Sequence, residues 1–315
     1  MTSAGAVETA AAAALRRLAL DERAKAVVLS DPRLRAAALR IARRYIGGES
    51  REDALAAAAR INSVGEAATV DYMGESTRER ELARAAADEF AAVAAAIAGR
   101  KLDCSLSLDL SHLGLVIDRS FCLENARRVA IAAAEAGTEV MVSMEDYDRV
   151  DRILDLHAVL ADDHENVGIT LQARLHRTAS DLETVLRRSG RIRLVKGAYE
   201  VPADGALARE DERLRGRYIE LARRLVASGH PCSIATHDEQ LLDEIAAMVA
   251  PGRDSPVEFE VLFGLGDDAI STLRARGLHT RQYIVYGEEW FLYVCNRIAE
   301  EPARLYQAVV DAIDR

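Results

Sequence analysis

The sequence predicts an α/β fold, a (βα)8 barrel of the TIM type with extra helices at the N-terminus and a C-terminal helix that caps the barrel mouth. Short apolar segments of strand length alternate with amphipathic segments of helix length after Gly99. At least seven such units follow one another, each roughly 30 residues long, which is typical of parallel strands joined by helices. Helices between all the strands would cover the sheet, and this favours a closed barrel.

The first hundred residues are predicted to be helical. Apolar residues recur three and four positions apart in residues 11–29, 32–46 and 76–99. Ser50 and Asp53 have the spacing of a capped helix start. We therefore expect an N-terminal helical segment, residues 1–100, followed by the barrel, residues 101–315, as one structural unit.

The seven predicted strands end in unusually polar residues. The strands are expected at residues 104–110, 139–144, 167–172, 192–196, 232–236, 258–263 and 282–286. In a TIM barrel the chemistry lies at the C-terminal strand ends. A purely structural barrel does not need such a density of charge at one rim, so we interpret it as the mouth of an active site. The residues at these ends are Asp109, His112, Ser143, Glu145, Gln172, Arg174, Arg193, Lys196, Thr236, His237, Glu258, Glu260, Tyr283 and Tyr286.

Composition limits the class of protein. Half of the 315 residues are hydrophobic, 29% are charged and the net charge is −10, so a general nucleic-acid binder is not expected. The four cysteines have no metal-binding spacing and are expected to pack in the core of a protein from a reducing compartment. We find no signal peptide and no apolar run of membrane-spanning length. A cytoplasmic protein with at most peripheral membrane contact is expected.

Lys196, in the stretch RLVKGAYE (193–200), is open to three interpretations. A lysine at a barrel strand end can form a Schiff base, as in an aldolase of class I. It can also bind a ligand phosphate, with the backbone N–H groups of Gly197 and Ala198 completing an anion cradle. The third interpretation is a rim lysine in a structural salt bridge.

Two further segments are candidates for ligand contacts. Thr236 and His237 directly follow a strand, where they are well placed to contact a ligand. The C-terminal stretch 286–305 reads as a helix in which Tyr293, Arg297 and Glu300 lie three and four residues apart. This helix either docks on the barrel surface through its aromatic residues or caps the mouth with Arg297 directed inward as a carboxylate anchor.

Together these motifs resemble the proline dehydrogenases, FAD-dependent enzymes that oxidise proline to Δ1-pyrroline-5-carboxylate. The resemblance covers about residues 40–312. The matching motifs, in chain order, are ARRYIGGES, VDYMGE, HLGL, MED, VGITLQ, RLVKGAY, ATHD, EFEVLFG and YGEEWFLYVCNRIAE. Several are specific, and their order agrees with the strands predicted above.

The resemblance implies an FAD site. Gln172 would face the pyrimidine edge of the flavin ring, and Arg193 would approach its N5 side as a catalytic residue. Lys196, Gly197 and Ala198 would hold the phosphates and the ribityl chain, which favours the phosphate interpretation of Lys196. The remaining cofactor contacts implied by the resemblance are Met144, through its backbone, and Thr236, His237 and Glu300.

The substrate pocket departs from the family pattern. Family members carry a lysine where this chain has Asp109, an aspartate where it has Ser143 and an arginine where it has Asn296. A glutamine is usual at Glu260. We expect Asp109 and Ser143 to be catalytic. The expected substrate-binding residues are Asp109, Tyr283, Tyr293, Asn296, Arg297 and Glu260, of which Tyr283, Tyr293 and Arg297 match the family.

Loss of one of two arginines should weaken the binding of a carboxylate by roughly 1–3 kcal/mol. The main hypothesis is an FAD-dependent dehydrogenase that oxidises the carbon next to nitrogen in proline or a proline-like amine, with a quinone or oxygen as electron acceptor. The alternatives are a relative retuned to a non-proline amine, a non-catalytic flavin-binding protein and an aldolase-type enzyme that uses Lys196.

Overall fold

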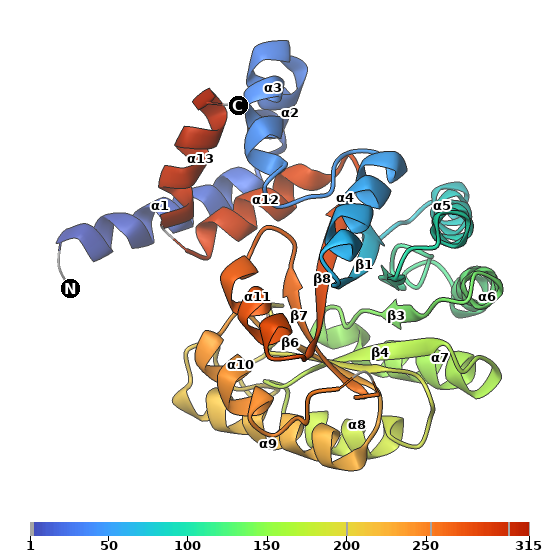
Figure 1. Cartoon of the computed structure of the whole chain (residues 1–315). Helices are drawn as coiled ribbons and strands as arrows, with labels where there is room; N and C mark the ends of the chain where they lie inside the picture. The colour runs from blue at the N-terminus through green and yellow to red at the C-terminus, as the bar shows by residue number, and fades with distance from the viewer. Residues whose placement is uncertain (1–2, 200, 253, 302, 315) are drawn as a thin grey trace.

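The computed structural model describes residues 3–199, 201–252, 254–301 and 303–314, and its centre is a closed barrel of eight parallel strands in chain order (Figure 1). β1 closes the barrel by pairing with β8 along its whole length, from Ala67 opposite Arg281 to Tyr72 opposite Tyr286. The predicted (βα)8 barrel is confirmed. The strands are β1 (Ala67–Tyr72), β2 (Cys104–Leu108), β3 (Val140–Val142), β4 (Val167–Gln172), β5 (Ile192–Val195), β6 (Cys232–Ala235), β7 (Val257–Leu262) and β8 (His279–Tyr286).

Helices surround the barrel and extend beyond it. Those that precede β2 are α1 (Ser3–Ala19), α2 (Glu22–Ser30), α3 (Pro32–Ala42), α4 (Arg51–Ser63) and α5 (Arg80–Arg100). Those between later strands are α6 (Arg119–Glu135), α7 (Val150–Asp163), which follows the short 3₁₀ turn η1 (Tyr147–Arg149), then α8 (Thr178–Val185), α9 (Glu212–Ser228), α10 (Glu239–Ala246) and α11 (Asp267–Ala275). The chain finishes with α12 (Trp290–Ala299) and α13 (Ala303–Asp314). None of the described helices is long and apolar enough to cross a bilayer.

The predicted start of α4 is a complete capping box. Ser50 Oγ accepts a hydrogen bond from the backbone N–H of Asp53, and the Asp53 carboxylate accepts one from the backbone N–H of Ser50. These bonds satisfy two of the donors that a helix start leaves free. The sequence signal therefore located this helix correctly.

The prediction of an entirely helical N-terminal segment was wrong for residues 67–72, which form β1. Gly65 has a φ of +84°, a conformation that favours glycine, and it ends α4 just before the strand. Ala68 and Val70 point into the packed shell around the barrel and are fully buried. The barrel therefore begins before residue 101, and β1 is its first strand.

All seven strands predicted from the sequence are confirmed. The β4 prediction matches residue by residue, and the largest difference is that β8 begins at His279 rather than at residue 282. Apolar residues such as Leu106 and Leu108 on β2 are buried in the core cluster that joins strands and helices. Because side chains alternate along a strand, the residues between them point into the barrel.

The barrel interior contains two polar layers. The lower layer consists of Thr69, Ser105, Ser233, Glu258 and Arg281. Arg281 donates to Glu258 Oε1 at 2.7 Å and to Ser105 Oγ at 3.1 Å, and Ser233 donates to Glu258 at 2.5 Å. Thr69 and Ser105 lie 3.0 Å apart. The upper layer, nearer the C-terminal strand ends, consists of Asp71, Ser107, Arg193, Glu260 and Tyr283 and forms the floor of the mouth.

A second hydrophobic cluster holds the terminal helices together at one end of the barrel, where α1, α3, α12 and α13 gather in Figure 1. Trp290 of α12 is almost fully buried there, and its indole N–H donates to Glu49 at 2.9 Å. Leu262 of β7 and Tyr283 of β8 pack against the same cluster. Helix α12 therefore lies at the C-terminal strand ends, where the sequence predicted a capping helix.

Candidate functional site

Arg193 is the centre of the upper layer. Its Nε donates to Glu260 Oε2 at 2.8 Å, and its Nη1 donates to Ser107 Oγ at 3.2 Å. The guanidinium lies over the ring of Tyr283, 4.8 Å from the ring centre. The side chains of Arg193 and Glu260 are only 5% and 2% exposed. An arginine held from two sides and stacked on an aromatic ring has one fixed orientation.

A chain of hydroxyl groups joins two carboxyl groups across this floor. Tyr283 donates to Asp71 and lies 3.3 Å from Ser107 Oγ, which is in turn 3.3 Å from Ser143 Oγ. Ser143 then hydrogen-bonds the carboxylate of Asp109. The structure thus brings the predicted residues Asp109, Ser143 and Tyr283 together around Arg193.

The two carboxyl groups at the ends of this chain are protonated more readily than usual. Burial raises the pKa of Asp71 to about 7, although the hydrogen bond from Tyr283 and the charge of Arg193 oppose the shift. Burial also raises the pKa of Asp109 well above its usual value, and the nearby carboxylates of Glu145 and Asp71 raise it further. Such shifts are typical of groups in functional sites.

Gln172 and Gly197 form a second part of the site. Gln172 Nε2 donates to the backbone carbonyl of Glu145 at 3.1 Å, but its Oε1 has no hydrogen-bond partner although it is buried. Gly197 has a φ of +106°, and an added Cβ would lie 2.7 Å from Gln172 Oε1 and 2.9 Å from Arg174 Cγ. The backbone therefore approaches the Gln172 amide in a way that only glycine permits.

Lys196 forms an ion pair at the rim. Its Nζ donates to Asp238 Oδ2 at 2.8 Å, and both side chains are about one third exposed. The hydrogen bond from Lys196 lowers the pKa of Asp238, even though partial burial acts in the opposite direction. Asp238 also caps α10 by accepting the backbone N–H of Leu241. This ion pair is what the third interpretation of Lys196 predicted, and a lysine paired with a carboxylate is less suited to act as a free amine nucleophile.

Thr236 and His237 follow β6 and lie close to the rim ion pair. Burial, with help from the positive charges of Arg304 and Arg297, lowers the pKa of His237 to about 4. Its Nε2 accepts a long bond of 3.4 Å from the Leu262 N–H, while its buried Nδ1 has no partner. A neutral imidazole with one unsatisfied nitrogen is suited to meet a polar ligand.

Helix α12 contributes an aromatic and charged face. Arg297 Nη2 lies 2.7 Å from Glu300 Oε1, and its guanidinium lies 5.3 Å from the centre of the Tyr293 ring. The Nε of Arg297 is buried and has no partner. The predicted spacing of Tyr293, Arg297 and Glu300 is therefore confirmed as real contacts. Asn296 lies one residue before Arg297 on the same helix and is partly exposed.

One predicted strand-end residue is not at the mouth: Glu258 is the second residue of β7 and lies in the lower layer with Arg281. The remaining predicted residues lie at the C-terminal end of the barrel. Met144 follows β3 and is almost fully buried in the main core. Ala198 follows Gly197 and is exposed, and its carbonyl accepts a hydrogen bond from Arg209. His112, a strand-end candidate, packs instead against Tyr72, with ring centres 5.3 Å apart, and burial lowers its pKa to about 4. His112 thus supports the fold.

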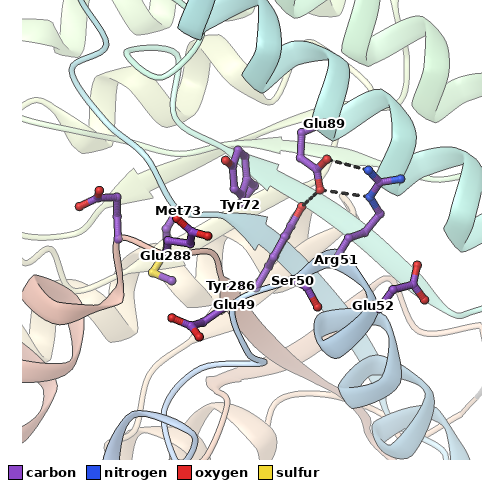
Figure 2. Close-up of a pocket in the computed structure, with 10 residues that line it drawn as sticks. Glu49, Ser50, Arg51, Glu52, Tyr72, Met73, Glu89, Tyr286 and Glu288 are labelled. Atoms are coloured by element: carbon purple, nitrogen blue, oxygen red, sulfur yellow. Dashed lines mark hydrogen bonds and ion pairs between the residues drawn. The ribbon is translucent and has the colours of Figure 1, made fainter. Parts of the chain in front are cut away.

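A separate cavity of about 580 Å³ opens beside the ends of β1 and β8. Figure 2 shows Glu89 at its edge, where the carboxylate accepts hydrogen bonds from Tyr286 at 2.7 Å and from Arg51 at 2.8 Å. Five glutamates and a single arginine are among the residues that line it: Glu49, Ser50, Arg51, Glu52, Tyr72, Met73, Glu89, Tyr286, Glu288 and Glu289. The rim beside the mouth is therefore strongly acidic.

Sequence reasoning missed four members of the site. Asp71 was hidden because β1 was not recognised, although it lies in the quoted motif VDYMGE. Ser107 sits inside a predicted strand rather than at its end. Tyr199 lies near Asp109, whose charge is the largest cause of the raised pKa of that tyrosine. Asp238 was included only as the last residue of the motif ATHD, next to His237, and was not predicted to pair with Lys196.

The arrangement fits a flat, polar cofactor with a phosphate tail. The unsatisfied Gln172 Oε1 lies beside the close backbone approach at Gly197, and Lys196, the residue before Gly197, provides a cation. His237 supplies another unsatisfied buried nitrogen from the next strand. These are the kinds of groups that a flavin ring and its phosphates require.

Comparisons with known proteins show which family the chain is similar to. The family model for proline dehydrogenase matches residues 54–303. The chain is 33% identical to proline dehydrogenase 1 of Bacillus subtilis subsp. natto over 265 residues, which are 83% of this chain and 87% of that protein. It is 32% identical to the proline dehydrogenase of Deinococcus radiodurans over 270 residues, 83% of this chain and 86% of that protein.

Solved structures show the same fold. Proline utilization A (PutA) from Bdellovibrio bacteriovorus, inactivated by N-propargylglycine, superposes with a TM-score of 0.75 at 19% identity and covers 83% of this chain. The chain spans 32% of the length of that PutA chain. At this level of identity the likeness concerns the barrel and its helices rather than the chemistry.

Proposed function

Because the chain belongs to the proline dehydrogenase family, we propose that it is an FAD-dependent oxidoreductase that oxidises the carbon next to nitrogen in proline or a proline-like amine. The observation that carries this proposal is the fixed Arg193. It is held by Glu260 and Ser107 in the barrel floor, on the strand that leads directly to Lys196 and Gly197. One short segment thus supplies groups for both the reacting end and the phosphate end of a flavin.

The residues around Gly197 would hold the cofactor. Gln172 Oε1 and the backbone at Gly197 are placed to meet the ring edge, and Lys196 is placed to meet a phosphate in exchange for part of its bond to Asp238. Met144, Ala198, Thr236, His237 and Glu300 complete the set of proposed contacts. When bound, FAD supplies a two-electron acceptor for the hydride that leaves the substrate carbon.

The residues on the floor would orient the substrate and manage its proton. The substrate nitrogen must lose a proton before the hydride leaves readily, and Asp71, with a pKa of about 7, is suited to accept it through Tyr283 Oη. Arg297 has a free Nε that can bind a carboxylate, and Tyr293 fixes its guanidinium. Tyr283, Asn296 and Ser143 would shape the remaining pocket.

The electrons would leave the reduced cofactor for a quinone or for oxygen. The protein is proposed to work in the cytoplasm, with at most peripheral membrane contact and no nucleic-acid partner. All four cysteines are unpaired and buried, which agrees with a reducing compartment.

The test uses the absorbance spectrum of the purified protein, followed by anaerobic addition of proline and a panel of cyclic amines. Bound flavin should give its two visible bands, and a substrate should bleach them. Gly197→Ala should abolish flavin binding, because its Cβ would meet Gln172 and its φ is unfavourable for alanine. Gly216→Ala is the matched control, since Gly216 is exposed on α9 with open space around it.

A protein that cannot be loaded with FAD contradicts the proposal. So does a flavin that no amine in the panel can bleach. Equal flavin content in the two glycine variants would remove the role given to Gly197, while the spectrum of the unmodified protein would still decide the activity.

A further inference from the structure

The charges that point into the upper barrel do not cancel. The region considered is the upper layer together with the strand ends directly above it on β1, β2 and β3. Among the described inward-facing residues of this region, Arg193 is the one cation. The same region contains the carboxyl groups of Asp71, Asp109 and Glu260. Arg193 is already paired with Glu260 at 2.8 Å. Two carboxyl groups therefore face the mouth with only hydroxyl partners, Asp71 with Tyr283 and Asp109 with Ser143.

Asp109 is the less compensated of these two groups. Asp71 lies within the electrostatic influence of Arg193, whereas the charges that act most strongly on Asp109 are all negative, those of Glu145, Asp71 and Glu75. Among the described residues Asp109 forms no ion pair. Its neighbours Leu108 and Leu110 are fully buried, but Asp109 itself is partly exposed to the mouth. Asp109 is therefore less tightly enclosed than the two leucines beside it.

Nearby carboxylates that serve the structure are paired. Glu145 is buried and forms an ion pair with Arg149 at 2.8 Å, and its other oxygen accepts the backbone N–H of Ser111 at 2.9 Å. In the lower layer Glu258 is held by Arg281. A carboxyl group without a cation in such a setting is costly to keep charged. A partner that arrives with the substrate would remove this cost.

We propose that Asp109 is the counter-ion for a second cationic group on the substrate, so that the preferred substrate is a cyclic amino acid or amine that carries an additional protonated nitrogen. This inference rests on the proposed function, because it names the substrate class for the same site. The amine that is oxidised would lie near Arg193 and Tyr283. A carboxylate, where the substrate has one, would bind Arg297, and the extra ammonium would bind Asp109 and the hydroxyl of Ser143.

The acidic rim agrees with this assignment. The cavity beside β1 and β8 is lined by five glutamates against one arginine, and the sequence as a whole carries a net charge of −10. A negative field around the mouth raises the local concentration of a cationic ligand and lowers that of an anionic one. The rim alone does not make a binding site, but it favours the same sign of ligand as Asp109.

The experiment compares matched substrates that differ by one charge. Anaerobic flavin reduction is measured at pH 7 for proline, for cis- and trans-4-hydroxyproline and for cis- and trans-4-aminoproline, and for pyrrolidine against 3-aminopyrrolidine. At least one aminated compound is expected to exceed its uncharged partner in kcat/KM by about tenfold or more, mainly through a lower KM. The hydroxylated compounds control for size and hydrogen bonding.

The role of Asp109 is tested with Asp109→Asn, which keeps the shape and removes the charge. The preference for the aminated compound over its uncharged partner should fall by about tenfold. Asp103→Asn, just before the opposite end of the same strand, is the matched control and should leave the preference intact. Dissociation constants from the concentration dependence of the anaerobic reduction rate separate binding from the rate of hydride transfer.

The outcomes separate this inference from the proposed function. If proline bleaches the flavin and no aminated compound is better, the second cation is excluded while the proposed function stands. If an aminated compound is preferred equally by the unmodified protein and by Asp109→Asn, the assignment to Asp109 is overturned. If neither class reduces the flavin, the proposed function itself fails.

Discussion

Each of the two polar layers inside the barrel contains a buried Arg–Glu ion pair, but the two pairs serve different purposes. Both contain a buried Arg–Glu pair at nearly the same distance, 2.7 Å for Arg281 with Glu258 and 2.8 Å for Arg193 with Glu260. In the lower layer the pair is closed off by serine and backbone partners, and Arg191 adds positive charge 3.6 Å from Glu258. The upper layer opens to the mouth and carries an excess of carboxyl groups.

The pKa values show the difference. Burial would raise the pKa of Glu258, but Arg281 and Arg191 more than offset it and lower the pKa to about 2. In the upper layer the hydrogen bond from Tyr283 and the charge of Arg193 only partly offset burial, and the pKa of Asp71 rises to about 7. The lower layer is therefore arranged as permanent structure, whereas the upper layer keeps groups whose charge can change during a reaction.

The largest expected effect comes from breaking each ion pair at its arginine. Arg281→Met should lower the free energy of unfolding by about 3–5 kcal/mol, because it leaves Glu258 buried with only the more distant Arg191. Arg193→Met should cost a similar amount and should also reduce amine-dependent flavin reduction by a factor of about 100 or more. Urea denaturation followed by circular dichroism, and anaerobic stopped-flow bleaching, measure the two effects.

A double variant sharpens this comparison. Replacing Arg281 by Met and Glu258 by Leu together removes both charges of the lower layer and should recover most of the lost stability. Flavin bleaching by the folded Arg281→Met protein should stay within a few-fold of normal. A loss of bleaching as large as that in Arg193→Met would show that the two layers are not functionally distinct.

An intermediate effect is expected for the pH dependence of stability. The folded protein binds a proton at Asp71 up to about pH 7, whereas the unfolded chain releases it near the usual pKa of 3.8. The folded state therefore holds more protons between these values, and Asp71 lowers stability as pH rises from about 4 to 7. Asp71→Asn should remove this decline and stabilise the protein by about 1–2 kcal/mol at pH 8.

The lower layer should respond in the opposite direction. Glu258 has a lowered pKa, so its contribution is complete above about pH 4.5 and is lost as the pH falls toward 2. Glu258→Gln should be destabilising at pH 7 and should flatten the acid side of the stability curve. Unfolding midpoints in urea from pH 3 to pH 8 test both variants. Asp109, whose pKa burial also raises, contributes a decline of the same sign. A decline above pH 4 that is as steep in Asp71→Asn as in the unmodified protein would contradict the assignment to Asp71.

The sequence predicted most of the barrel because its signals there are local. Seven strands are apolar runs bounded by helices of clear periodicity, and each was found within three residues of its true start. β1 was missed because it follows a helix after a short turn and lies in an alanine-rich region where helical periodicity dominates. Its strand-favouring residues are Thr69, Val70 and Tyr72, and alanines precede them.

The individual residues of the site were predicted better than the contacts that they make with one another. Strand-end position alone pointed to Arg193, Tyr283 and Glu260. That Glu260 pairs with Arg193 depends on the register of β5, β6 and β7, which no local pattern encodes. The hydroxyl link through Ser107 was likewise invisible, because a serine within a strand gives no signal until the barrel closes around it.

The smallest expected effect concerns the electrostatic role of Glu260. Its carboxylate cancels much of the positive charge of Arg193 next to the proposed flavin ring. Glu260→Gln keeps a hydrogen-bond acceptor for Arg193 Nε but removes the negative charge, so the reduced, more negative form of the flavin should become more stable. The two-electron midpoint potential should rise by about 30 mV, which corresponds to about 1.4 kcal/mol.

The control is the same substitution one layer lower. Glu258→Gln removes an equal charge from the same strand, but Arg281 and the lower layer separate it from the mouth. Its effect on the midpoint potential should therefore be clearly smaller, because Coulomb interactions fall with distance. Dye-linked reduction of the two holoproteins measures both values. Equal shifts would mean that the flavin senses the total charge of the barrel interior, and the special position of the Arg193–Glu260 pair would then have to be given up.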